Sequence, residues 1–170
     1  MKEIQIIALV SLCVAAVLAD MGAGKIPNSV TGTGLVMGLF YQVMDKSVLG
    51  IPLYFGGALL PVVLLGALYY FRMIGAGDIK LLCVIGGFLG PGGCFSCLTG
   101  AVFLGGAISL AVIVIRGIGW KRWMYLTGYI SEYSRTGQWR SYMEGMEEEA
   151  GFCFSVPVLL SVLWHVGRSV

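Results

Sequence analysis

The sequence contains few charged residues. Only 12% of its 170 residues are Asp, Glu, Lys or Arg, whereas 58% are hydrophobic. A soluble domain typically has about 25% charged and about 45–50% apolar residues, so this composition excludes a disordered chain, a coiled coil and an ordinary cytosolic enzyme. The formal net charge of +2 is too small to indicate binding to nucleic acid. The composition indicates a small polytopic membrane protein.

Histidine is nearly absent, which restricts the hydrolytic mechanisms open to the chain. His165 is the single histidine and lies near the C-terminal end, so a serine or cysteine triad has no evident base. The sequence also lacks the HExxH signature of zinc peptidases. Cys94 and Cys97 have CxxC spacing without a second ligand pair, and we interpret this motif as incidental rather than as a metal or redox site. We therefore expect no metal and no cofactor.

Six apolar stretches predict an all-α membrane protein with about six transmembrane helices. They comprise residues 4–19, 30–43, 51–71, 79–89, 94–115 and 152–166. One helical span needs about 20 residues, and the second and fourth stretches are shorter than this. They must tilt, include flanking residues in the span, or be shielded by protein or water.

Residues 117–150, between the fifth and sixth stretches, interleave aromatic with basic residues. This pattern predicts an amphipathic segment at the cytoplasmic membrane interface. We interpret the acidic end of this segment as a solvated loop tip. A weak docking site for a basic peptide is the alternative.

The basic residues are distributed unevenly between the predicted loops. Eight of them follow the first, third and fifth stretches, and three lie on the opposite side. Lys and Arg accumulate in cytoplasmic loops, so we expect both termini to lie outside. Asp20, at the end of the first stretch, and Asp78, at the start of the fourth, then face the same side of the membrane.

These two aspartates are the candidates for chemistry among the nine acidic residues, because the other seven lie in termini or loops. An ionisable group at membrane depth costs about 2.5–3.5 kcal/mol on insertion scales and usually marks a functional site. Two carboxylates a few ångströms apart share one proton. The ionised member can then take a proton from water while the protonated member polarises a carbonyl. This is the chemistry of an aspartic peptidase.

Each aspartate also has a structural interpretation. Asp78 follows Gly75 and Gly77 and can be the N-cap of a helix after a glycine turn. Glycine at these two positions permits backbone angles closed to other residues and lets another segment approach closely. Asp20 can be a loop residue that ends the first stretch. Neither interpretation explains why both carboxylates lie on one face of such an acid-poor chain.

Two sequence elements carry a family resemblance. Asp20 is followed at positions 25–28 by the residues KIPN, and residues 75–81 read GAGDIKL. Together they resemble the bacterial type IV prepilin peptidases, which are GxGD intramembrane aspartic proteases. By this resemblance Asp20 and Asp78 would be the catalytic pair. The supporting motif would comprise Gly75, Gly77, Lys80, Lys25, Pro27 and Asn28.

The resemblance also implies substrates and a location. The substrates would be prepilins or pseudopilins, in which a short basic leader precedes a hydrophobic helix. The protein would be a multi-pass protein of the bacterial cell (inner) membrane, in contact with the lipid bilayer and with its active site facing the cytoplasm. No nucleic-acid partner is expected.

The chain is similar to the short, peptidase-only form of that family, because its first apolar stretch starts at residue 4. We therefore expect one membrane-embedded peptidase domain over residues 1–170, without an N-terminal methyltransferase domain. Two alternatives stay open. One is a protease like signal peptide peptidase, which shares the GxGD chemistry. The other is a non-enzymatic transporter or assembly factor that uses the same carboxylates to bind protons or cations.

Overall fold

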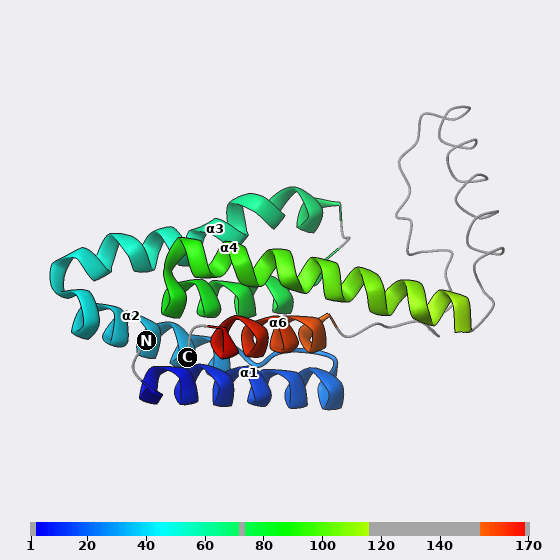
Figure 1. Ribbon diagram of the computed structural model, residues 1–170, viewed down its shortest axis with the longest axis horizontal. Helices are drawn as coiled ribbons and strands as arrows, with labels where there is room; N and C mark the ends of the chain where they lie inside the picture. Colours follow the sequence, from blue (N-terminus) through cyan, green and yellow to red (C-terminus); the bar gives the residue numbers. More distant parts are fainter. Residues whose placement is uncertain (1–2, 72–73, 116–153, 169–170) are drawn as a thin grey trace. The chain divides into compact units, whose positions relative to one another are not determined.

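The computed structural model describes residues 3–71, 74–115 and 154–168, and the regular structure in these ranges is entirely helical. Its elements are α1 (Glu3–Ala23), α2 (Asn28–Lys46), the 3-10 helix η1 (Ser47–Leu49), α3 (Gly50–Tyr70), α4 (Ala76–Ile115) and α6 (Ser155–Gly167), as Figure 1 shows. The predicted all-α class is confirmed. The predicted interfacial segment, residues 117–150, lies outside the described residues.

Three helical stretches of the described chain are long and apolar enough to cross a membrane. They are Glu3–Gly22, Asn28–Tyr70 and Ala76–Val112, and α6 is a shorter apolar helix. Large apolar side chains on these helices are exposed, among them Val36, Val63 and Phe103. A soluble protein rarely exposes apolar surface on this scale, and the surface therefore suits contact with lipid.

The chain divides into two units, residues 1–104 together with 153–170, and residues 105–152. In the second unit the structure describes the last turns of α4, in which Leu110, Val114 and Ile115 are exposed. The first unit contains the buried core and the candidate site.

Helix α4 is interrupted at Gly90, where the chain turns back on itself. Gly90 has φ 74° and ψ 180°, and this positive φ favours glycine because glycine has no Cβ. Pro91 follows, and proline suits the first position of a helix, where the backbone nitrogen needs no helical partner. The result is a helical hairpin whose first limb is residues 76–89 and whose second limb begins at Pro91 (Figure 1).

The turn at Gly90 is held by polar contacts that cross between segments. Sγ of Cys94, at the start of the second limb, lies 3.8 Å from the carbonyl oxygen of Leu82 in the first limb. The carbonyl oxygen of Phe88, next to the turn, accepts a hydrogen bond of 2.9 Å from Nε2 of the buried Gln5 in α1. These contacts satisfy polar groups that would otherwise be buried without a partner.

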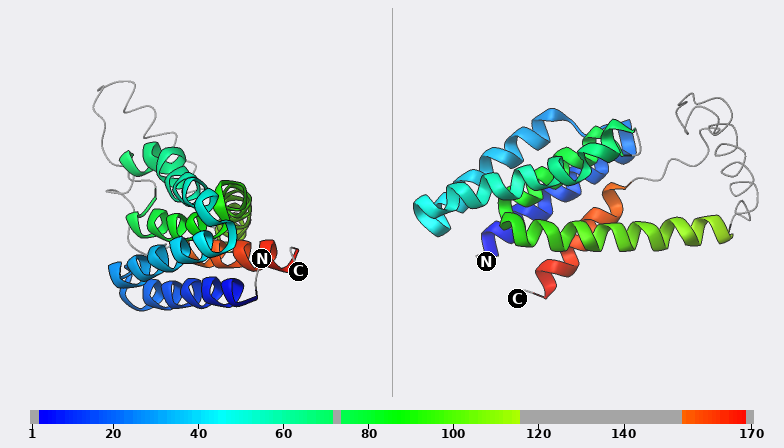
Figure 2. Two further views of the ribbon diagram at one scale, coloured as in Figure 1. Left: turned by 90° about the vertical axis from the view of Figure 1, so that its left-hand side faces the viewer. Right: turned by 90° about the horizontal axis from the view of Figure 1, so that it is seen from above.

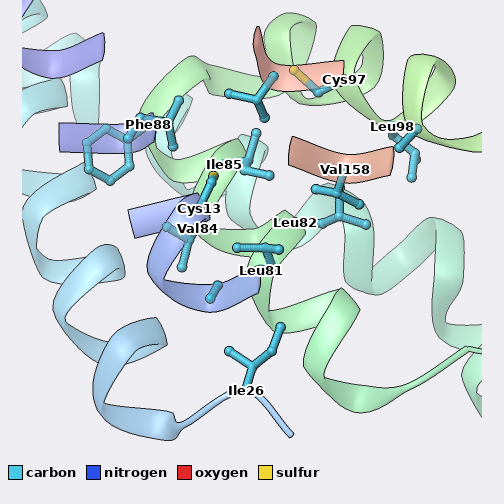
Figure 3. Packing of buried hydrophobic residues seen from close by; sticks show 14 of the residues in the cluster. Cys13, Ile26, Leu81, Leu82, Val84, Ile85, Phe88, Cys97, Leu98 and Val158 are labelled. Carbon is cyan, nitrogen blue, oxygen red and sulfur yellow. The ribbon is translucent and has the colours of Figure 1, made fainter. Parts of the chain in front are cut away.

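The first limb of α4 lies at the centre of the core. Leu82 and Ile85 are fully buried there, and Figure 3 shows them among side chains from α1 and α6, including Cys13 and Val158. The other neighbours, α2 and α3, approach this limb through glycines. The facing pairs are Gly34 with Val84, Gly38 with Phe88, and Gly57 with Gly86. The short predicted stretch 79–89 is therefore shielded by protein, which was one of the alternatives open to it.

Helices α1 and α6 each bury one face. In α1 the buried residues Gln5, Leu9, Cys13 and Ala16 recur at intervals of three or four, as expected for one stripe of a helix. The two helices pack against each other, and Figures 1 and 2 both show them side by side. This packing brings the last turn of α1 next to the first turn of α6.

Candidate functional site

Asp20 lies in the last turn of α1 and is half-buried. The helix extends beyond the predicted apolar stretch, so the interpretation of Asp20 as a loop residue is wrong. Gly24 follows the helix with φ 61°, and its backbone N–H donates a hydrogen bond of 2.8 Å to the carbonyl oxygen of Asp20. A glycine with positive φ is a common helix terminator. It turns the chain sharply into residues 25–28.

Asp78 lies in the first turn of α4 and is also half-buried. The helix begins at Ala76, so Gly75 occupies the N-cap position and Asp78 is the third helical residue. The interpretation of Asp78 as an N-cap is therefore wrong. Its carboxylate accepts a hydrogen bond from the backbone of Gly75, which is the contact that an acidic side chain makes from this position in a capping box. The helix start thereby fixes the direction of the carboxylate.

The two glycines of the GxGD element serve close packing rather than unusual backbone angles. Among the described residues the positive φ values belong to Gly24, Ser47 and Gly90, so the expectation of special angles at Gly75 and Gly77 is wrong. A Cβ on Gly75 would lie 3.3 Å from Oδ2 of Asp78. A Cβ on Gly77 would lie 3.3 Å from Cγ1 of the buried Ile26. The expected close approach of another segment is therefore present at Gly77, whereas the neighbour of Gly75 is Asp78 of the same motif.

A single pocket of about 580 Å³ contains every residue that the sequence predicted for the site. It is lined by Asp20, Gly24, Lys25, Ile26, Pro27, Asn28, Gly75, Ala76, Gly77, Asp78 and Lys80. The lining comes from the end of α1, the connection between α1 and α2, the first residue of α2, and the start of α4. The sequence analysis did not name Gly24, Ile26 and Ala76 for the site, although they adjoin the predicted residues in the chain.

The pocket contains charged groups of both signs. The carboxylates of Asp20 and Asp78 are close enough for a repulsive electrostatic interaction. Across the pocket, Nζ of Lys80 donates a hydrogen bond of 2.8 Å to Oδ1 of Asn28. Two carboxylates and two lysines, the second being Lys25, thus share one half-open space at the ends of apolar helices.

Sequence reasoning missed one polar contact of the site. Oγ of Ser155, at the start of α6, donates a hydrogen bond of 2.6 Å to Oδ2 of Asp20. Ser155 is fully buried and is not among the residues that line the pocket. A serine within an apolar stretch carries no signal of this kind, because it usually bonds to a carbonyl of its own helix.

Two aspartates from separate helices, sharing a pocket at the ends of membrane-length apolar helices, define a membrane protein with a paired-carboxylate site. The family model for the type IV leader peptidase family matches residues 7–110, which is more than half of the chain and includes every residue lining the pocket. The chain belongs to this family of aspartic-type prepilin peptidases. The resemblance seen in the sequence is confirmed. No curated protein and no solved structure matches the chain.

Proposed function

We propose that this protein removes the short basic leader peptide from type IV prepilins or pseudopilins, at the cytoplasmic face of the bacterial cell membrane. Asp20 and Asp78 are the catalytic pair, and the site works without a metal or cofactor. The observation that carries the proposal is the joint position of the two carboxylates in one pocket at the ends of apolar helices. The peptidase forms a single membrane-embedded domain in this proposal.

The proposed topology has six membrane crossings, namely α1, α2, α3, the two limbs of α4, and α6. The stretches Asn28–Tyr70 and Ala76–Val112 contain 43 and 37 residues, about twice what one crossing needs. The chain turns back between α2 and α3 and again at Gly90 (Figure 1). Helix α6 has 13 residues, which span about 20 Å, so this crossing uses flanking residues.

The pocket supports placing the connections after α1 and α3 on one side of the membrane, because it is lined by residues 24–27 and by Gly75. The distribution of basic residues supports a cytoplasmic position for this side. A prepilin leader is basic and cytoplasmic, whereas the following segment is a hydrophobic helix. The scissile peptide bond would thus reach the pocket at the membrane surface.

The proposed reaction is hydrolysis of a peptide bond by a water molecule held between the carboxylates. The ionised aspartate takes a proton from this water, whose oxygen forms a bond to the scissile carbonyl carbon. The protonated aspartate gives its proton to the carbonyl oxygen, so that a neutral tetrahedral diol results. The first aspartate then transfers its proton to the leaving nitrogen, the C–N bond breaks, and the second aspartate takes a proton back from the diol.

The surroundings of Asp20 and Asp78 suit acid–base catalysis by a pair of carboxylates. Both side chains are half-buried, and the like charges repel. This disfavours the state in which both are ionised, since each charge raises the cost of the other. A pair that retains one proton provides the acid and the base that the reaction requires.

Leader removal in cells tests the proposal. A candidate prepilin from the same genome is co-expressed with the wild-type protein, Asp20→Asn or Asp78→Asn, and the shortening of the pilin is followed. Each substitution is expected to reduce cleavage by about 10²–10⁴-fold, because it removes a group that must exchange a proton. The control is Asp45→Asn, since Asp45 is exposed near the end of α2 and does not line the pocket.

The outcomes separate the alternatives. Processing at the wild-type rate by either pocket variant, with normal amounts in the membrane, would remove that aspartate from the catalytic role. Processing by both would show that the pair is not catalytic, and processing that does not depend on this protein at all would favour the non-enzymatic transporter or assembly factor.

A further inference from the structure

The contact between Ser155 and Asp20 joins α6 to α1 across 135 positions of the sequence. The distance of 2.6 Å lies in the range of O–H hydrogen bonds to an ionised carboxylate, which are about twice as strong as neutral ones. Ser155 has 0% of its surface exposed. The hydroxyl that bonds to Oδ2 of Asp20 is therefore itself shielded from water.

The position of Ser155 in its helix makes this contact specific. It is the first residue of α6, and the helix is anchored by Val158 and Val162, which are fully buried in the core. A second buried serine on the same helix, Ser161, donates its hydroxyl to the carbonyl oxygen of Val158 at 2.8 Å. Ser161 shows the usual behaviour of a helical serine. Ser155 instead directs its hydroxyl to another helix.

Asp20 and Asp78 lie at opposite ends of their helices. Asp78 lies in the first turn of its own helix, where the N-terminal end of the helix dipole favours a negative charge. Asp20 lies in the last turn of α1, where the dipole disfavours one. The hydroxyl of Ser155, at the N-terminal end of α6, supplies Asp20 with a hydrogen-bond donor from another helix.

We propose that Ser155 is a positioning residue for Asp20. Its hydroxyl holds Oδ2, so that Oδ1 is the oxygen presented to the substrate water. Ser155 lies outside the pocket, so it acts through the aspartate and does not touch the substrate. This inference rests on the proposed function and adds to it a group from the last helix.

The test is steady-state cleavage of a purified prepilin by the purified full-length protein in detergent. Ser155→Ala is expected to lower kcat roughly tenfold while KM stays at the wild-type value, because the hydrogen bond to a charged group is lost but leader binding is untouched. Ser161→Ala is the matched control. It removes the same hydroxyl from a buried position of the same helix and is expected to leave both constants unchanged.

Two results would overturn the inference. One is a wild-type kcat for Ser155→Ala, and the other is a raised KM with kcat preserved, which would assign Ser155 to leader binding. Asp20→Asn in the same assay separates this failure from failure of the proposed function. If Asp20→Asn is inactive while Ser155→Ala is fully active, the positioning role alone is wrong.

The thermal unfolding midpoint of each variant is measured as a control for correct folding. If Ser155→Ala unfolds at a lower temperature than Ser161→Ala, Ser155→Cys decides the question, because a thiol keeps similar size and is a weaker donor. A lowered kcat at unchanged KM for Ser155→Cys supports the inference. A wild-type kcat overturns it.

Discussion

Lys80 and Asn28 are joined by a hydrogen bond of 2.8 Å from Nζ to Oδ1, although 52 positions separate them in the sequence. Asn28 begins α2 and Lys80 lies near the start of α4. The bond therefore ties the segment that follows Asp20 to the segment that carries Asp78. Both partners are exposed and line the pocket, so we expect the bond to matter more for the geometry of the site than for stability.

The substitutions Lys80→Met and Asn28→Ala are each expected to reduce kcat/KM for leader cleavage several-fold. The free energy of unfolding should change by less than about 1 kcal/mol, because an exposed hydrogen bond contributes little net stability. The double variant should be no worse than the more impaired single variant, with a coupling energy of about 0.5–1 kcal/mol. If the losses of kcat/KM in the two single variants simply add in the double variant, the two side chains act separately. Lys46→Met, an exposed lysine in the last turn of α2, is the control.

Gly77→Ala tests the close contact between the GxGD element and Ile26. The added Cβ would lie 3.3 Å from Cγ1 of Ile26, a buried residue of both the core and the pocket wall. Overpacking of this kind costs about 1–3 kcal/mol, which exceeds the gain of about 0.5–1 kcal/mol from replacing a helical glycine. We therefore expect a lower thermal unfolding midpoint and slower leader cleavage.

Gly22→Ala, at the end of α1, is the matched control for Gly77→Ala, because its Cβ would have nothing within 4 Å. The control should unfold at or above the wild-type midpoint. Equal unfolding midpoints for the two variants would show that the Ile26 side chain can move aside without loss of stability.

Gly57→Ala tests the close approach of α3 to the central limb of α4. A Cβ at this position would overlap the backbone carbonyl of Gly86, and a backbone cannot give way as a flexible side chain can. The helices would have to separate, which we expect to lower the free energy of unfolding by about 3 kcal/mol. The measurement is the thermal unfolding midpoint in detergent together with the amount of protein in the membrane.

Gly66→Ala, in the same helix, provides the comparison for Gly57→Ala because its Cβ would meet open space. It is expected to be neutral or slightly stabilising. A Gly57→Ala protein as stable as Gly66→Ala would contradict the packing of α3 against α4 described above.

Much of the candidate site could be predicted from the sequence, because its residues fall into two short segments. Residues 20–28 and 75–80 each keep their members together through local chain geometry, and an aspartate beside an apolar stretch is conspicuous in an acid-poor chain. The local conformations were harder to predict. The apolar stretch 4–19 ends before the end of α1, and the stretch 79–89 begins after the start of α4. A helix includes polar residues at its ends, and its limits lie at residues such as Gly24 after α1 and Gly75 before α4.

By itself the sequence determined the all-α class, the apolar helices and the family, because composition, helix-length apolar runs and short motifs are local properties of the chain. Only the tertiary structure decided that the limb at residues 76–89 forms the centre of the core and that Ser155 bonds to Asp20. Both depend on which helix faces which. The packing of these helices is stabilised by many apolar and glycine contacts between distant segments, and no single contact leaves a pattern in the sequence.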